Sequence, residues 1–193
     1  MSSLSSFSSS SSSSSYEPDS SSSSSSSWEE DMEIHTGQIT VYDADGDDAT
    51  KDGTPKSYTD NGDGTITDNQ TDLVWQKDHK DNGANLYWAD AIDYAATLQN
   101  GVDGLTDGSN LGDWRVPSNL ELMTLADYNY PSSSYLNSVF TQIGWDDTCH
   151  GYWASTTMTN DTTSAYVLVA ENAQLGYGIK DFDPFGVRCV RNA

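Results

Sequence analysis

Positively charged side chains are scarce in this chain of 193 residues, which has 8 Lys and Arg against 30 Asp and Glu. The formal net charge is −22, and no Lys or Arg precedes Lys51. Such a negative chain repels nucleic-acid phosphates and anionic membranes, and it disfavours sulfated polysaccharides as ligands. We therefore expect neither nucleic acid nor membrane insertion, and cations, calcium above all, as counter-ions.

Long apolar runs are absent as well. No stretch of about 18 consecutive apolar residues occurs, so we expect no transmembrane helix. The first residues have neither a basic region nor an apolar core, so we expect no secretory signal peptide among them. The route of any secretion is left open.

Cysteine is limited to Cys149 and Cys189, which are either free core thiols or one disulfide. A bridge would close a loop of about 40 residues and contribute roughly 4 kcal/mol in the chain-entropy model. Abundant Ser, Thr, Asn and Asp with few lysines suit an extracellular or cell-surface protein, so we favour the bridge. The neighbouring His150 suggests a thiol nucleophile, but adjacency alone does not supply the fixed base or lowered thiol pKa that catalysis needs.

Serine is the residue in excess, with 20 copies among the first 27 residues. This segment buries too little apolar surface to offset the entropy of ordering. We expect it to take a fixed shape only against a neighbouring subunit or with covalent sugar; the alternative is a flexible, unmodified spacer. The candidate O-glycosylated serines are Ser8, Ser9, Ser10, Ser11, Ser12, Ser20, Ser21, Ser22, Ser23 and Ser24.

We divide the chain into a Ser-rich low-complexity tail (1–27), an acidic connector (28–56) and a globular domain (57–193). In the connector, apolar residues alternate with polar ones, which predicts one or two strands. The alternating residues are Met32, Ile34, Ile39 and Val41.

In the domain, residues 65–68 and 73–75 flank a polar turn and predict a hairpin. A helix is predicted over 85–99, because its apolar residues recur at helical spacing. A second helix begins at Ser118, where Ser118 and Glu121 form a capping box, and ends by Pro131. Short strands are predicted at 151–155, 165–169, 176–179 and 187–190. This order of elements indicates an α+β domain.

The domain contains six distinctive phrases in a fixed order: Tyr58–Asp68, Leu73–Lys77, Trp88–Ala91, Asp113–Pro117, Tyr152–Thr157 and Val187–Arg191. In this order and spacing they resemble the Legionella collagen-like C-terminal domain family. The family belongs with the C-type-lectin-like and formylglycine-generating-enzyme-like folds. The resemblance, over about residues 57–192, implies two helices and a twisted antiparallel sheet. It also implies an adhesive or ligand-binding head on an extracellular or cell-surface protein, without catalysis.

The sequence departs from the family pattern at one cysteine and in its charge. Many members have a cysteine on the first helix that pairs with the counterpart of Cys189; here that position is Ala95. The resemblance therefore implies that Cys189 pairs with Cys149. Family members that bind sulfated glycans need a basic surface, which this chain lacks, so that ligand class does not carry over.

An acidic loop is the candidate metal site. Its alternating carboxylates resemble the first half of a calcium loop, but the EF-hand pattern fails at Asp48 and Thr54, where Gly and Glu are needed. We favour a solvated acidic loop over a calcium site. The four residues are Asp43, Asp45, Asp47 and Asp48; a weaker second set is Asp60, Asp63 and Asp68.

Aromatic and basic side chains complete the candidate set. Most aromatic residues fall inside the family phrases and are expected in the core. Tyr128, Tyr130, Tyr135 and Trp145 lie between those phrases and are candidates for contact with a ligand or a neighbouring subunit. The arginines Arg115, Arg188 and Arg191 are expected to pair with buried carboxylates.

The favoured function is that of a non-catalytic, extracellular, self-assembling structural protein, such as a filament or surface-appendage subunit. The strands of the connector would offer an edge for strand addition between copies. The alternative is a surface adhesin or binding module that recognises carbohydrate or protein through its loops.

Overall fold

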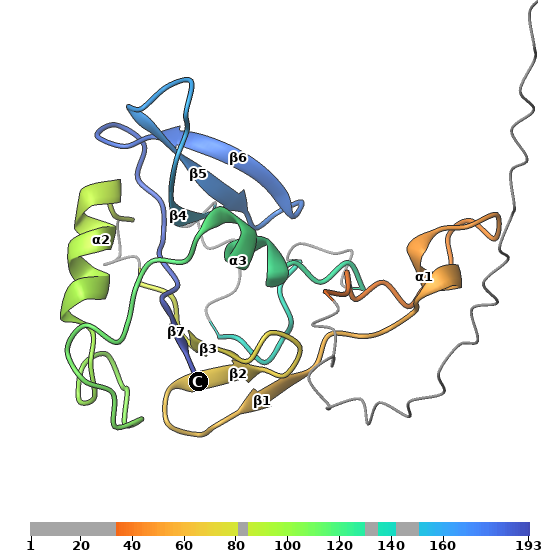
Figure 1. The fold of residues 1–193 in the computed structure, drawn as a ribbon, viewed down its shortest axis with the longest axis horizontal. Coiled ribbons are helices and arrows are strands. Elements are labelled where there is room, and N and C mark those ends of the chain that lie inside the picture. The colour runs from red at the N-terminus through yellow and green to blue at the C-terminus, as the bar shows by residue number, and fades with distance from the viewer. Residues whose placement is uncertain (1–33, 81–84, 130–134, 142–150) are drawn as a thin grey trace, which may run out of the picture. The chain divides into compact units, whose positions relative to one another are not determined.

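The computed structural model describes residues 34–80, 85–129, 135–141 and 151–193, all within one compact unit from Met32 to Ala193 (Figure 1). The described residues form a mixed α+β fold, as the sequence predicts, but they contain two antiparallel sheets and three helices, whereas the resemblance implied one sheet and two helices. None of the helices described is long and apolar enough to cross a membrane. The helices are α1 (Asp48–Lys51), α2 (Trp88–Thr97) and α3 (Asn119–Thr124). The strands are β1 (Tyr58–Asp60), β2 (Thr65–Asp68), β3 (Leu73–Gln76), β4 (Gly151–Thr157), β5 (Ser164–Val169), β6 (Gln174–Ile179) and β7 (Val190–Asn192).

The first sheet has the order β1-β2-β3-β7 and contains the predicted hairpin. Thr65 pairs with Gln76 and Asp68 with Leu73 across the hairpin. The Asp68 carboxylate accepts the N–H of Gln70 at 2.9 Å and so stabilises the turn. Strand β7 closes the sheet beside β3, which brings the end of the domain against its beginning.

The second sheet, β4-β5-β6, lies between two apolar clusters. On one face, Trp153 and Val167 pack in a cluster with Ala91 and Ala95 of α2. The other face contributes residues of β4 and β5, including Leu168, to a cluster that also contains residues of α3. Successive strand side chains alternate between the faces, so one short sheet joins both cores.

Both predicted helices are present. Helix α2 begins at Trp88, three residues later than predicted, because Asn85 has a left-handed φ of 58° and Leu86 pairs with Phe185 in an isolated bridge. Helix α3 has the predicted capping box between Ser118 and Glu121.

The predicted connector strands are wrong for the described residues 34–47, which contain no strand. The carboxylate of Asp47 accepts the N–H groups of Tyr42, Asp43 and Thr50, so these groups bond to a side chain rather than to a partner strand. Ile34, Ile39 and Val41 remain exposed. Met32 lies outside the described residues.

The last strand is also shifted from its predicted position, 187–190. Val187 pairs with Lys80 in an isolated bridge, whereas β7 begins at Val190. The shift occurs because the backbone changes partners between these residues, from Lys80 to β3 and Arg115.

Candidate functional site

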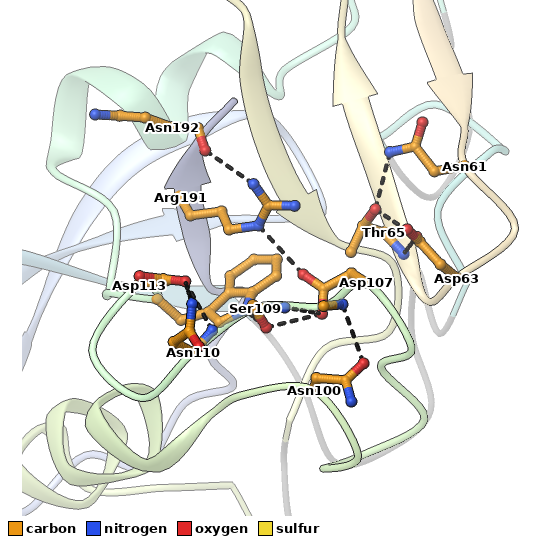
Figure 2. A network of polar contacts seen from close by, with 12 residues as sticks. Asn61, Asp63, Thr65, Asn100, Asp107, Ser109, Asn110, Asp113, Arg191 and Asn192 are labelled. Atoms are coloured by element: carbon orange, nitrogen blue, oxygen red, sulfur yellow. Dashed lines mark hydrogen bonds and ion pairs between the residues drawn. The ribbon is translucent and has the colours of Figure 1, made fainter.

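A polar hollow of about 380 Å³ lies beside β7 and is lined by Asp113, Arg115, Arg191, Asn192 and Ala193. Two of the chain's few cations meet here because Arg115 and Val190 exchange backbone hydrogen bonds at 3.0 and 2.9 Å. Figure 2 shows Arg191 and Asn192 on β7, with Asp113 in the loop beside them. The hollow is therefore built from two segments that are far apart in the sequence.

Arg191 is held in place by a buried carboxylate. Its Nε donates to Asp107 at 3.2 Å, and the Asp107 side chain is fully buried (Figure 2). Asp107 also accepts from the Ser109 hydroxyl at 2.8 Å, and that hydroxyl accepts from Trp114 Nε1 at 2.9 Å. The guanidinium lies 5.5 Å from the centroid of the Trp114 ring. These contacts restrict the orientation of Arg191.

Arg115 is fixed by a bidentate pair with Glu121. Its two terminal nitrogens donate to the Glu121 carboxylate at 2.7 and 2.5 Å. The hydrogen bonds from Arg115 are the main reason why the pKa of Glu121 is lowered to about 2. The same contact raises the pKa of Arg115.

The chemistry of the hollow suits neutral polar ligands. Arg115 and Arg191 each have a neutralising carboxylate, and Asp113, whose carboxylate accepts from the N–H of Asn110 at 2.7 Å, adds a negative charge to the lining. Carboxylate, amide and guanidinium groups together can accept from and donate to hydroxyl groups.

A second surface feature is a row of apolar side chains on β6. Leu175, Tyr177 and Ile179 alternate along the strand and are 38%, 65% and 43% exposed. Phe182, in the turn that follows, is 75% exposed. The row lies on one face because strand side chains alternate with a period of two.

The glycines between these residues explain which way the row points. A Cβ on Gly178 would lie 2.5 Å from Phe185 and 2.9 Å from Trp153, so the inner face of β6 has no room for a side chain there. The alternation of glycine with large residues from Leu175 to Ile179 is the sequence signal that could have identified this exposed row.

Strand β6 is also an open edge of its sheet. Lys180 N donates to Thr163 O at 2.9 Å, and Ile179 is opposite Ser164. Because hydrogen-bonded pairs alternate in antiparallel ladders, the backbone groups of Leu175, Tyr177 and Ile179 point away from β5. Ile179 is occupied there: its N–H donates to the carboxylate of Asp183 at 2.8 Å, and its C=O accepts from the N–H of Asp183 at 2.8 Å and of Phe182 at 3.1 Å. Among the described residues, the outward groups of Leu175 and Tyr177 have no hydrogen-bond partner.

The other sheet edges in the described part of the chain are covered or short. Trp153 of β4 donates to the carbonyl of Gly186 at 2.9 Å, and β7 bonds to Arg115. Strand β1 has three residues, and its Asp60 pairs with Lys77 at 2.7 Å. Short and charged edges resist strand addition, which leaves β6 as the accessible edge.

The predicted acidic loop uses its carboxylates to hold its own backbone. Asp43 accepts the N–H of Asp45 at 2.9 Å, Asp47 caps α1, and Asp48 accepts from the Thr36 hydroxyl. Among the residues described, no three His, Cys, Asp or Glu side chains are placed to hold a metal ion. In the second set, Asp60, Asp63 and Asp68 accept from neighbouring N–H groups, as in ordinary turns.

Of the four candidate aromatic residues, the structure describes two and brings them together. The rings of Tyr128 and Tyr135 meet edge to face, with centroids 5.7 Å apart. The Tyr128 hydroxyl donates to Ala173 O at 3.4 Å. Tyr130 and Trp145 lie outside the described residues.

The arginine prediction is confirmed for Arg191, whose partner Asp107 has a fully buried side chain. Arg115 pairs instead with a partly exposed carboxylate, that of Glu121, and the prediction is wrong for Arg188 within the described residues. The fully buried guanidinium of Arg188 donates to the carbonyls of Gln76 and Thr141 at 2.8 and 3.1 Å. Among the described ion pairs none includes Arg188, so carbonyl oxygens take the place of the expected carboxylate.

The predicted disulfide is not seen in the structure, where Cys189 is a buried free thiol. Burial raises the pKa of this thiol. Its proposed partner Cys149 lies outside the described residues, as do all the candidate glycosylated serines. The pairing and the glycosylation stay predictions.

Comparison with known proteins identifies the family. No curated protein matches the chain. The model of the Lcl C-terminal domain, the Legionella collagen-like C-terminal domain, matches residues 64–191, from the start of the β2–β3 hairpin to β7. The match includes the network around Asp107 and the edge strand β6. The chain therefore belongs to the Lcl C-terminal domain family.

Proposed function

We propose that this protein is a non-catalytic, extracellular or cell-surface structural protein that assembles with copies of itself, as a subunit of a filament or surface appendage. The observation that carries the proposal is the open edge of β6, with its exposed row of Leu175, Tyr177 and Ile179. A long apolar strand edge that is left accessible favours association with another chain.

Net charge limits how copies of the chain can meet. With −22 per copy, two molecules repel each other wherever carboxylates face carboxylates. Strand β6, from Gln174 to Ile179, has no charged side chain. Contact through β6 therefore brings no charged side chain of the strand itself against another copy, and added salt should screen the remaining repulsion.

A filament requires more than one contact. A twofold contact closes a dimer, whereas a contact between two different surfaces continues into a fibre. The exposed Ile34, Ile39 and Val41 of the connector are a further apolar surface for the second contact. We propose that the Ser-rich tail runs along the neighbouring subunit or carries O-linked sugar.

The test is the assembly state of the purified full-length chain. Sedimentation velocity from low to high micromolar concentration, with negative-stain microscopy of the same samples, should show association that increases with concentration and salt. Monomers at every concentration and salt would overturn the proposal. An intact mass that equals the bare sequence would remove the sugar and leave assembly standing.

The polar hollow beside β7 favours a second function, the binding of a neutral carbohydrate by an adhesin. Asp113, Arg115 and Asn192 supply oriented acceptors and donors for hydroxyl groups. A panel of neutral oligosaccharides on a surface should capture the chain, and Asp113→Ala should abolish the capture. Equal capture of the variant would exclude this hollow as the binding site.

A further inference from the structure

The geometry of β6 points to one mode of self-association, a twofold antiparallel pairing of β6 with β6 of a second copy. This inference rests on the proposed function and adds the strand, the partner and the register. Its partner is a second copy because the part of this edge from Leu175 to Tyr177, which has no charged side chain, is present on every molecule of a chain whose charge of −22 otherwise opposes contact between copies. An isologous contact uses one patch twice and needs no other surface.

The free backbone groups select the register. Leu175 and Tyr177 both point their N–H and C=O groups away from β5, whereas the N–H of Ile179 is already bonded to Asp183. We therefore place Leu175 of one copy opposite Tyr177 of the other. In this register the outward N–H and C=O groups of both residues form hydrogen bonds with the partner strand. Gly176 then lies at the twofold axis. A register centred on Tyr177 would instead use Ile179, whose N–H is occupied.

The side chains favour the same arrangement. Residues opposite each other on antiparallel strands point to the same face of a sheet, so the two apolar rows would merge into one strip. Leu175 of each copy would contact Tyr177 of the other, which gives two equivalent pairs, one on each side of the twofold axis. Cross-strand pairs of an aromatic and an aliphatic side chain stabilise sheets.

The expected affinity is modest. The exposed parts of Leu175, Tyr177, Ile179 and Phe182 amount to roughly 400 Å² of accessible surface per copy, by the usual areas of such side chains. A stable interface of standard size buries about 800 Å² per partner. The dimer should therefore form and dissociate in the micromolar range, which makes it measurable by dilution.

Amide hydrogen exchange tests the pairing on the unmodified full-length chain. We expect the N–H groups of Leu175 and Tyr177 to exchange at least tenfold more slowly in the associated sample than in the dilute one. Gly176 and Gly178 already donate to β5 and should be protected in both samples, which makes them internal controls. Association without protection of Leu175 and Tyr177 would overturn the pairing and leave self-assembly standing.

A pair of variants tests the same strand in another way. Tyr177→Lys puts a charge on the edge and should raise the dissociation constant of the dimer at least tenfold. The matched control is Leu120→Lys, because Leu120 on α3 is 76% exposed and lies on another element; it should leave association unchanged. Equal weakening by both variants, or no effect of Tyr177→Lys, would overturn the pairing. If the unmodified chain is monomeric at every concentration, both the pairing and the proposed self-assembly are overturned. If a variant perturbs folding, the hydrogen-exchange measurement on the unmodified chain still tests the pairing.

Discussion

Arg115 and Glu121 form two parallel hydrogen bonds of 2.7 and 2.5 Å that join the wall of the polar hollow to the first turn of α3. Glu121 also accepts from the N–H of Ser118 at 2.8 Å, as part of the capping box. One carboxylate therefore stabilises the start of a helix and orients a guanidinium of the candidate site.

This double role gives a pH dependence. The pKa of Glu121 is about 2 in the folded chain and 4.5 is its ordinary value, so its stabilisation is complete above about pH 4.5 and is lost as the pH falls toward 2. Glu121→Gln should lower the free energy of unfolding by about 1 kcal/mol at pH 7, after allowance for solvent screening. Urea unfolding of both chains from pH 7 to pH 3 should show this difference shrinking below pH 4.5. A difference that is constant with pH would contradict the assignment; Asp181→Asn, an exposed carboxylate, serves as control.

Arg188 should be one of the residues on which stability depends most. Its guanidinium lies 4.9 Å from the Phe140 ring and 5.4 Å from the Tyr152 ring, and it satisfies buried carbonyls. Arg188→Met keeps much of the apolar volume but leaves those carbonyls unsatisfied, so we expect a loss of about 3 kcal/mol in urea unfolding.

The matched comparison for Arg188 is Lys77→Met. Lys77 forms a partly exposed pair with Asp60, and such pairs contribute about 0.5 kcal/mol. Equal effects of the two substitutions would show that Arg188 is not a central contact of the fold.

Local patterns in the sequence were sufficient for most elements of the fold. The stripe that includes Ala91 and Ala95 and the capping box at Ser118 are short-range signals, and the structure has both helices. The prediction of strands in the connector was wrong because alternating apolar and polar residues do not by themselves supply a partner strand. In the fold, the Asp47 carboxylate accepts from the backbone N–H groups that a strand would use.

The site features depend on contacts that no short window of sequence contains. Arg115 and Arg191 line one hollow only because Arg115 bonds to the backbone of Val190. Likewise, β6 could be predicted as a strand, but its openness depends on which other segments cover each sheet edge. Arg188 was assigned a carboxylate because buried cations usually need one, whereas three backbone carbonyls converge on it in the fold.

The reactivity of Cys189 tests both its burial and the predicted disulfide. Because burial raises its thiol pKa, Cys189 should react with a thiol reagent only slowly in the folded chain, even at pH 9, and rapidly in denaturant. Peptide mass spectrometry would locate the label. Fast labelling of the folded chain would contradict the burial. A Cys189 that stays unlabelled in denaturant without reductant would instead support the bridge to Cys149.

The two glycines of β6 provide a sharp test of how this strand packs. A Cβ on Gly178 would meet aromatic carbons of Phe185 and Trp153 at 2.5 and 2.9 Å, whereas on Gly176 its nearest neighbour is a methyl group of Val169 at 3.3 Å. Gly178→Ala should therefore cost about 2 kcal/mol through overpacking, and Gly176→Ala less than about 1 kcal/mol. The rings of Trp153 and Phe185 meet edge to face with centroids 5.0 Å apart, so neither can withdraw without losing this contact. Thermal and urea unfolding of both variants measures the contrast. Equal stabilities would mean that the inner face of β6 does not pack on these rings, and the outward direction of Tyr177 would then lose its structural basis.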